Sequence, residues 1–285
     1  MKFGIYGNTG KKDISVVLNK ITSYLEKKGQ KYFIESSLSR FIKNKTPMSQ
    51  ICKISEIIKK CDIIISLGGD GTFLRSARKT GKAEIPILGI NLGNLGFMAE
   101  ISPEQAEEFL GKVIDGKYKV YDLCVISGIC ERQKIFGMNE IVIDKCNSIK
   151  MIDIEIKYKK ESVVKFVADG VIVSTPTGST GYSLSAGGPI ISPYSKVFII
   201  TPICPHTLNF RPIIVPDDGE IVISTTKKGK VRFTSDGFTS TIHSSPAVFK
   251  IKKADYNIKI VKDLDKTYFQ TLNTKLLWGA DSRKF

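Results

Sequence analysis

Apolar and polar residues follow two different patterns along this chain, and the change falls near residue 120. In the first part, apolar residues recur at helical spacing between short apolar runs, as from Ile14 to Leu25, and Gly29 then supplies a stop. The strands predicted in this part are residues 2–6, 31–35, 61–67 and 85–90. This alternation predicts an α/β domain with an open, mostly parallel sheet and a ligand site at the carboxyl ends of its strands.

Two further helices are predicted before residue 120. Residues 51–58 carry isoleucines on one face of a helix. Another helix begins at residues 102–105, because Ser102 can cap it, Pro103 suits the first turn and Gln105 completes a capping box. The run at 61–67 is nearly continuous in apolar residues, which is typical of a strand buried on both faces of a parallel sheet.

From about residue 119 the pattern favours short strands that are separated by Gly, Pro, Asp and Ser. Residues 152–158 alternate strictly between apolar and polar, as a half-exposed antiparallel strand does. Further strands are predicted at 197–201, 212–215, 220–225, 231–234, 247–252 and 257–261. We therefore predict an α/β domain at 1–120, followed by a mostly β domain at 121–262.

Composition places the chain among ordinary globular proteins. Of its 285 residues, 42% are hydrophobic and 25% are charged, so packed cores are expected rather than disorder. No apolar run approaches the length that crosses a bilayer. The apolar stretch at the N-terminus is too short for a signal peptide, because polar residues follow it at once. We therefore predict a cytoplasmic protein.

The formal charge of +15 fits either nucleic-acid binding or the steering of a small polyanion. The lysines form many small clusters without interleaved aromatic residues, so most of them are expected to be a solvated surface. The six cysteines show no Cys-x-x-Cys spacing, and Cys61 and Cys124 lie in apolar, core-like surroundings. Because His206 and His243 are the only histidines, the sequence does not favour a zinc site or a histidine-based catalytic triad.

A glycine-rich turn follows the apolar strand at 61–67. In Gly68-Gly69-Asp70-Gly71-Thr72, three glycines allow a sharp turn and let phosphates approach main-chain N–H groups. The following helix offers unpaired N–H groups to an anion, and Arg75 adds a positive charge. Asp70 would repel phosphate unless it has a task, such as orienting a hydroxyl, accepting its proton or helping to hold a metal ion. A tight turn in which Asp70 only caps the helix is the alternative.

Two other glycine-rich segments do not match known phosphate-binding loops. Residues 7–12 lack the Walker spacing and end in Lys rather than Ser or Thr. Residues 89–96 are not a Gly-x-Gly-x-x-Gly fingerprint, although they follow a strand and are candidates for lining the same crevice. A standard P-loop or Rossmann site is therefore disfavoured.

Hydroxyl groups and glycines dominate residues 175–189. Such a run is poorly suited to a core but can hydrogen-bond a flat polar ring at close range. Asn139 and Glu140 place an amide and a carboxylate together at a strand start, where they can grip the two hydroxyls of a ribose. The alternatives are a plain surface loop and an exposed strand end.

Together these segments resemble the signature segments of the NAD kinase family. The Gly-Gly-Asp-Gly-Thr motif is shared with lipid kinases of the diacylglycerol type and, in similar form, with phosphofructokinases. Asn139-Glu140 and the run 175–189 resemble NAD kinases and neither of the others. The likeness continues through 201–208 and Arg211-Pro212 to the tail, from Tyr268-Phe269 to Trp278-Gly279.

The resemblance implies transfer of the γ-phosphoryl group of ATP, or of another donor such as polyphosphate, to the 2′-hydroxyl of the adenosine ribose of NAD, giving NADP. It makes Asp70 the proton acceptor facing that hydroxyl, with Gly71 beside it. Asn139 and Glu140 would contact ribose, and Asp169 a polar edge of the dinucleotide. The residues expected to line the base are Thr180, Gly181, Tyr182, Ser183, Leu184 and Ser185. The residues expected to make further substrate contacts are Arg75, Lys150 and Thr177.

The resemblance also implies a tail at 263–285 that packs back on the N-terminal domain, and Mg²⁺ that accompanies the phosphoryl donor. It implies a homodimer or homotetramer in which a neighbouring subunit completes the NAD site, with no membrane or nucleic-acid partner. Three residues depart from the family pattern: Val167 replaces an arginine, Phe238 a polar residue and Gly181 an alanine. Two alternative functions are considered. One is a lipid or sugar kinase, and the other is a non-catalytic protein that binds nucleic acid or senses nucleotides.

Overall fold

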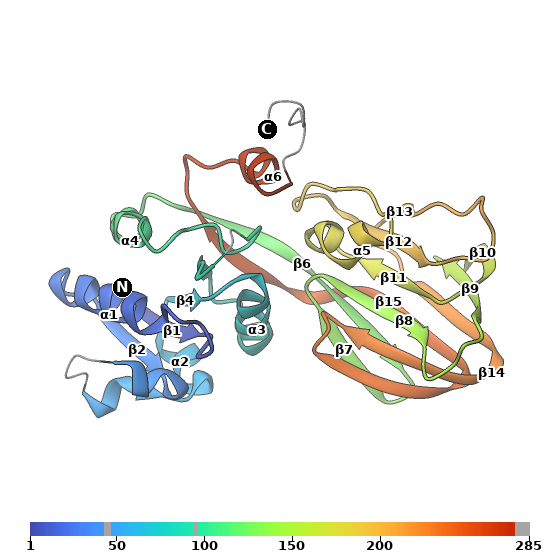
Figure 1. Ribbon diagram of the computed structural model, residues 1–285, viewed down its shortest axis with the longest axis horizontal. Helices are drawn as coiled ribbons and strands as arrows, with labels where there is room; N and C mark the ends of the chain where they lie inside the picture. The colour runs from blue at the N-terminus through green and yellow to red at the C-terminus, as the bar shows by residue number, and fades with distance from the viewer. Residues whose placement is uncertain (43–46, 94–95, 277–285) are drawn as a thin grey trace. The chain divides into compact units, whose positions relative to one another are not determined.

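The computed structural model describes residues 1–42, 47–93 and 96–276 (Figure 1). Residues 94–95 of the second glycine-rich segment and the Trp278-Gly279 ending therefore lie outside the described residues. Two compact units are present: Met1–Asp122 with Ile258–Phe285, and Leu123–Asn257. No helix in the described ranges is both long and apolar enough to span a membrane.

A parallel sheet forms the centre of the first unit and confirms the predicted α/β class. Its strands are β1 (Lys2–Gly7), β2 (Lys31–Glu35), β3 (Ile51–Cys52), β4 (Ile63–Leu67) and β5 (Ile87–Ile90). They lie in the order β5-β4-β1-β2-β3, and each neighbouring pair runs parallel. The end of β15 (Thr239–Lys262) joins β5, with Ile260 opposite Ile87. All five residues of β4 are buried, as their apolar run predicts.

The helices of the first unit follow its strands. They are α1 (Ile14–Lys27), α2 (Ile54–Lys60), α3 (Asp70–Thr80), α4 (Ala106–Ile114) and α6 (Tyr268–Leu276), with short 3₁₀ turns at Ser36–Phe41, Met48–Gln50 and Gly81–Ala83. The helix predicted over 51–58 is partly wrong, because Ile51 pairs with Ile34 and extends the sheet. At α4, Ser102 and Gln105 exchange the two capping-box hydrogen bonds at 3.4 Å, while the regular helix begins at Ala106.

The second unit is built from antiparallel strands, which confirms the predicted β-rich region. They are β6 (Lys119–Cys130), β7 (Gln133–Gly137), β8 (Glu140–Lys145), β9 (Ile152–Tyr158), β10 (Glu161–Ala168), β11 (Gly170–Ser174), β12 (Val197–Ile203), β13 (Ile213–Pro216), β14 (Ile221–Ser235) and most of β15. The main order is β13-β12-β11-β8-β14-β15. A 3₁₀ turn (Thr177–Thr180) and the short helix α5 (Tyr182–Ser185) follow β11.

Two pairs of predicted strands are in fact single long strands. Residues 221–225 and 231–234 both belong to β14, and 247–252 and 257–261 both belong to β15. The Lys227-Lys228-Gly229 segment resembles a turn, but it forms an irregularity in the pairing, after which Gly229 pairs with Ser245. The cysteines of the chain are free, and burial raises the pKa of Cys61 to about 12 and that of Cys124 to about 11, as expected of core thiols.

Candidate active site

The glycine-rich turn at 68–72 connects β4 to α3. A side chain at Gly68 would clash with Thr72, because an added Cβ would lie 2.2 Å from the Thr72 hydroxyl oxygen. Gly69 precedes the first turn of α3, and no side chain caps the helix. The alternative in which Asp70 only caps the helix is therefore wrong.

Asp70 instead directs its carboxylate at the segment that follows β5. Its Oδ2 accepts a hydrogen bond from the backbone N–H of Phe97 at 2.9 Å. Its Oδ1 accepts from the N–H groups of Met98 and Ala99 at 3.0 and 3.1 Å. The ammonium of Lys275 on α6 lies 3.1 Å from Oδ2. The first unit thus brings the predicted acceptor together with a cation that the sequence reasoning did not select.

This environment keeps Asp70 ionised. Burial acts to raise the pKa of the carboxyl, but the charge of Lys275 and the three backbone N–H donors outweigh it and lower the pKa. The Asp70 side chain is 26% exposed, so it is not sealed from solvent. On the same helix, Gly71 is exposed with no atom within 4 Å of an added Cβ, and Arg75 is exposed.

In the second unit, pairing of β8 with β11 brings the Asn-Glu pair against the hydroxyl-rich run. The N–H of Thr175 donates to the carbonyl of Asn139 at 2.8 Å, and its hydroxyl donates to the carbonyl of Met138 at 2.6 Å. An added Cβ at Gly178 would lie 2.1 Å from the Asn139 carbonyl oxygen. Glycine at 178 therefore permits a backbone approach that places the two segments in one site.

Asp236, which the sequence reasoning did not select, holds the Asn-Glu segment in place. Its carboxylate accepts hydrogen bonds from the N–H groups of Met138, Asn139 and Glu140 at 2.7, 2.8 and 3.1 Å. The sequence signal was the turn that Asp236 forms with Gly237, where both residues have positive φ. Burial, together with the nearby charge of Asp236, raises the pKa of Glu140 to about 8.

Where the Asn-Glu pair meets the hydroxyl-rich run, three polar atoms are buried without a hydrogen-bond partner among the described residues. They are Oδ1 of Asn139, Oε2 of Glu140 and Oγ1 of Thr177. Buried polar atoms in folded proteins are nearly always paired, so unpaired ones call for an explanation. The Asn139 oxygen accepts hydrogen bonds, whereas the Glu140 carboxyl and the Thr177 hydroxyl can each donate or accept, so a ligand rich in hydroxyls would satisfy all three.

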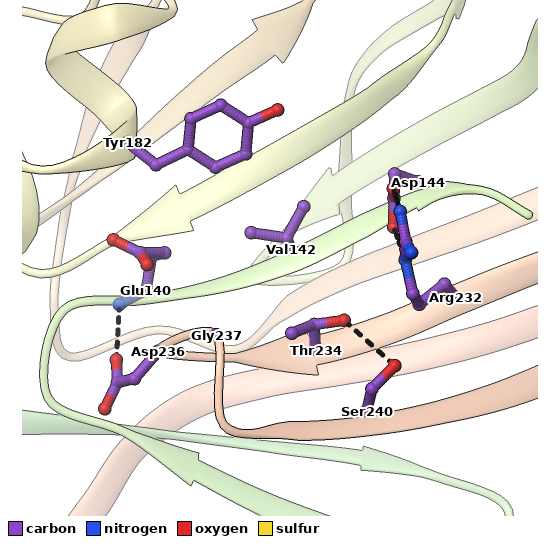
Figure 2. Close-up of a pocket in the computed structure, with 9 residues that line it drawn as sticks. All are labelled: Glu140, Val142, Asp144, Tyr182, Arg232, Thr234, Asp236, Gly237 and Ser240. Atoms are coloured by element: carbon purple, nitrogen blue, oxygen red, sulfur yellow. Dashed lines mark hydrogen bonds and ion pairs between the residues drawn. The ribbon is translucent and has the colours of Figure 1, made fainter. Parts of the chain in front are cut away.

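Of these three residues, Glu140 lines a pocket of about 480 Å³, whereas Asn139 and Thr177 are not among its lining residues (Figure 2). Because side chains alternate along a strand, Glu140, Val142 and Asp144 of β8 share one face of it. Their cross-strand neighbours on β14 complete that face, with Thr234 opposite Val142 and Arg232 opposite Asp144. The remaining lining residues are Tyr182, Asp236, Gly237 and Ser240.

Tyr182 supplies an aromatic ring to this pocket from α5 (Figure 2). It is 46% exposed, which leaves ring surface free for stacking. Arg232 and Asp144 form an ion pair on the facing strands. Neither was selected from the sequence, because an Arg on one strand and an Asp 88 residues earlier carry no local signal.

The other predicted site residues are distributed around this region. Thr180, Gly181 and Leu184 are partly buried and Ser185 is exposed, whereas Ser183 is fully buried with its hydroxyl 3.0 Å from that of Thr201. Asp169 pairs with Lys145 at 2.7 Å.

Three further positions lie away from the 480 Å³ pocket lining. Lys150 is exposed in the loop before β9. Val167 lines a separate pocket of about 350 Å³, and Phe238 is 41% exposed.

Comparison with known proteins identifies the family. Models of the ATP-NAD kinase N-terminal and C-terminal domains match residues 3–118 and 138–263. An NAD kinase of Bacteroides fragilis is 40% identical over 292 residues, which cover 99% of this chain and 100% of that protein. The crystal structure of an Archaeoglobus fulgidus NAD kinase in complex with ATP superimposes with a TM-score of 0.78 at 27% identity, covering 97% of this chain and 99% of that one.

A yeast NADH kinase complexed with NADH shares the fold with a TM-score of 0.90, at 23% identity over 100% of this chain and 90% of that one. The family models cover most of the chain, and the similarity to the bacterial relative extends over nearly its full length. The resemblance noted in the signature segments is thereby confirmed. The chain belongs to the NAD kinase family and is an enzyme of that family.

Proposed function

We propose that this chain transfers the γ-phosphoryl group of ATP, or of another phosphoryl donor, to the 2′-hydroxyl of the adenosine ribose of NAD, giving NADP. Family membership supports the reaction. The observation that carries the residue assignment is the ionised carboxylate of Asp70 at the start of α3, on a partly exposed side chain and fixed by three backbone N–H groups. A fixed anion of this kind can orient a substrate hydroxyl.

Asp70 acts as an acceptor that takes the proton late. An ordinary carboxyl has a pKa of about 4 and is a weak base toward an alcohol. As the 2′-oxygen attacks the γ-phosphorus, its hydroxyl becomes acidic and the proton passes to Asp70. The bond between the γ-phosphorus and the bridging oxygen breaks, and ADP leaves. Because the transition state is loose, positioning and charge neutralisation account for most of the rate.

The second unit binds the dinucleotide. The unpaired oxygens of Asn139 and Glu140 accept hydrogen bonds from ribose hydroxyls, and Thr177 contacts a polar edge of the ligand. Tyr182 stacks on a base, and Thr180, Gly181, Leu184 and Ser185 shape the wall that surrounds it. Asp169 binds a polar edge, while Lys150 and Arg75 contribute positive charge. Ser183 supports this wall through its buried bond to Thr201 rather than through direct contact.

Mg²⁺ enters as part of the donor, bound by its phosphates. Within the described ranges, no three His, Cys, Asp or Glu side chains gather as they do in a protein-held metal site. Phosphate oxygens are ligands that Mg²⁺ prefers, and the ion offsets the charge of the donor.

We also expect a homodimer or homotetramer in the cytoplasm. Ile213 and Ile214 are 41% and 44% exposed on β13, the terminal strand of the sheet, which suits subunit contact. Light scattering coupled to size exclusion measures the assembly, and cell fractionation measures the location.

The first experiment follows NADP formation from NAD, ATP and Mg²⁺ with an NADP-specific dehydrogenase. Asp70→Asn is expected to bind NAD but lose turnover, while the exposed control Asp115→Asn keeps it. Near-native turnover in Asp70→Asn overturns the residue assignment. No NADP from ATP or from polyphosphate would favour a lipid kinase, or a nucleic-acid-binding protein whose affinity falls steeply with salt.

A further inference from the structure

Lys275, near the end of α6, forms an ion pair with the carboxylate assigned to proton transfer. Its Nζ lies 3.1 Å from Oδ2 of Asp70 and 4.3 Å from the centre of the Phe97 ring. Both members of the pair are partly buried, with 29% of the Lys275 side chain and 26% of the Asp70 side chain exposed. Partial burial makes the pair stronger than one on an open surface.

The helix that carries Lys275 is held by other contacts as well. The hydroxyl of Thr271 donates to Oε2 of Glu100 at 3.2 Å, and that carboxylate pairs with Lys262 at 2.9 Å. Leu272 is buried. Lys275 therefore stays near Asp70 even when its own ion pair is broken.

Asp70 already uses its acceptor capacity in this arrangement. A carboxylate offers about four lone-pair sites. Two on Oδ1 accept backbone N–H groups, and Oδ2 accepts the N–H of Phe97 and the ammonium of Lys275. The backbone donors are fixed, whereas Lys275 ends a flexible four-carbon stem. A substrate hydroxyl can thus reach Oδ2 most easily by taking the place of Lys275.

We propose that Lys275 is a catalytic residue whose ammonium leaves Asp70 and pairs with the phosphoryl group that is being transferred. This inference rests on the proposed role of Asp70. The 2′-hydroxyl of NAD replaces Lys275 at Oδ2, and the ammonium remains within reach of the 2′-oxygen. When the O–P bond forms and the bond to the leaving diphosphate breaks, the hydroxyl proton makes Asp70 neutral. Lys275 then pairs with the new 2′-phosphate.

This role differs from that of a lysine that only pins the tail, because NADP carries the 2′-phosphate and NAD does not. Dissociation constants for both are measured by calorimetry, without donor, on the native chain, Lys275→Met and Lys275→Arg. Loss of a charge-assisted contact should weaken NADP binding by about tenfold or more in Lys275→Met. NAD binding should change by less than about twofold, and Lys275→Arg should recover most of the NADP affinity.

The control is Lys266→Met, which removes a lysine of the same tail that contacts Gln105 and the carbonyl of Glu100. It should leave the ratio of the two dissociation constants unchanged. An unchanged ratio in Lys275→Met overturns the inference, and Lys275→Gln replaces that variant if circular dichroism shows it unfolded. If the native chain forms NADP and Asp70→Asn does not, this failure concerns Lys275 alone. A native chain that forms no NADP sinks both proposals.

Discussion

Gly96 lies so close to Asp70 that a Cβ added to it would be 2.0 Å from Oδ1 of the carboxylate. The carboxylate oxygens are fixed by the next three backbone N–H groups, so they cannot retreat without losing hydrogen bonds. The absence of a side chain at 96 is therefore a condition for the position of the acceptor. It also makes the catalytic geometry testable without changing Asp70 itself.

We expect Gly96→Ala to lower kcat by about 100-fold or more, because a misplacement of about 1 Å in a reacting group has that effect. The steady-state rate of NADP formation measures it, with circular dichroism to show that the fold is retained. Gly229→Ala is the matched control, since no atom lies within 4 Å of its added Cβ. Full activity in Gly96→Ala would mean that Asp70 can act from a different position.

Glu140→Gln should stabilise the protein increasingly as pH rises. Burial and Asp236 raise the pKa of Glu140 from its ordinary 4.5 to about 8. Between these values the folded state holds a proton that the unfolded state has released, so native stability falls with rising pH. The neutral amide removes this loss, which is on the order of a few kcal/mol at pH 8.

Melting temperatures of the native chain and Glu140→Gln, measured in ligand-free protein from pH 5 to pH 9, test this expectation. The difference should be small at pH 5 and should grow up to about pH 8. Glu161→Gln, at an exposed position of the same unit, should show no such trend. A difference that does not vary with pH would show that Glu140 is ionised throughout.

Local sequence patterns predicted the fold where packing agrees with them. The apolar run of β4 and the alternation of β9 indicate their positions directly, because one strand is buried on both faces and the other on one. The lengths of β14 and β15 were not predictable. These strands of 15 and 24 residues contain polar segments that resemble turns, yet pairing with neighbouring strands keeps the segments extended. Local β-propensity cannot predict such continuity.

The same distinction applies to the candidate site. Asp70 and the Asn139-Glu140 pair were found because each sits in a short motif of unusual chemistry. Asp236 and Lys275 were missed because their partners lie 97 and 205 residues away in the chain. Their roles arise only from tertiary contacts. Asp236-Gly237 indicates a turn but not which groups the carboxylate binds, and nothing local marks Lys275.

Gly178→Ala should weaken NAD binding and destabilise the second unit. The added Cβ would lie 2.1 Å from the Asn139 carbonyl oxygen. The nearest atoms all belong to the Asn139 backbone, so no flexible side chain can move aside to relieve the clash. Overpacking of this kind costs about 1–3 kcal/mol. Urea denaturation and NAD titration measure the two effects, and Gly229→Ala should change stability by no more than about 1 kcal/mol. Unchanged NAD affinity would separate this contact from the ligand site.

Glu100→Gln tests how α6 is anchored. Glu100 is buried, and its carboxylate pairs with Lys262 and accepts a hydrogen bond from the hydroxyl of Thr271. Removing one charge of a buried pair leaves the other uncompensated, so we expect a loss of about 3–5 kcal/mol in the free energy of unfolding. Hydrogen exchange should rise in 268–276 well before it rises in α1, because this helix depends on the bond from Thr271.

Glu108→Gln, which breaks a 3.8 Å pair whose Glu side chain is 75% exposed, should cost about 1 kcal/mol or less. Equal exchange across both helices would place the anchor of α6 elsewhere, in Leu272 and the Lys275–Asp70 pair.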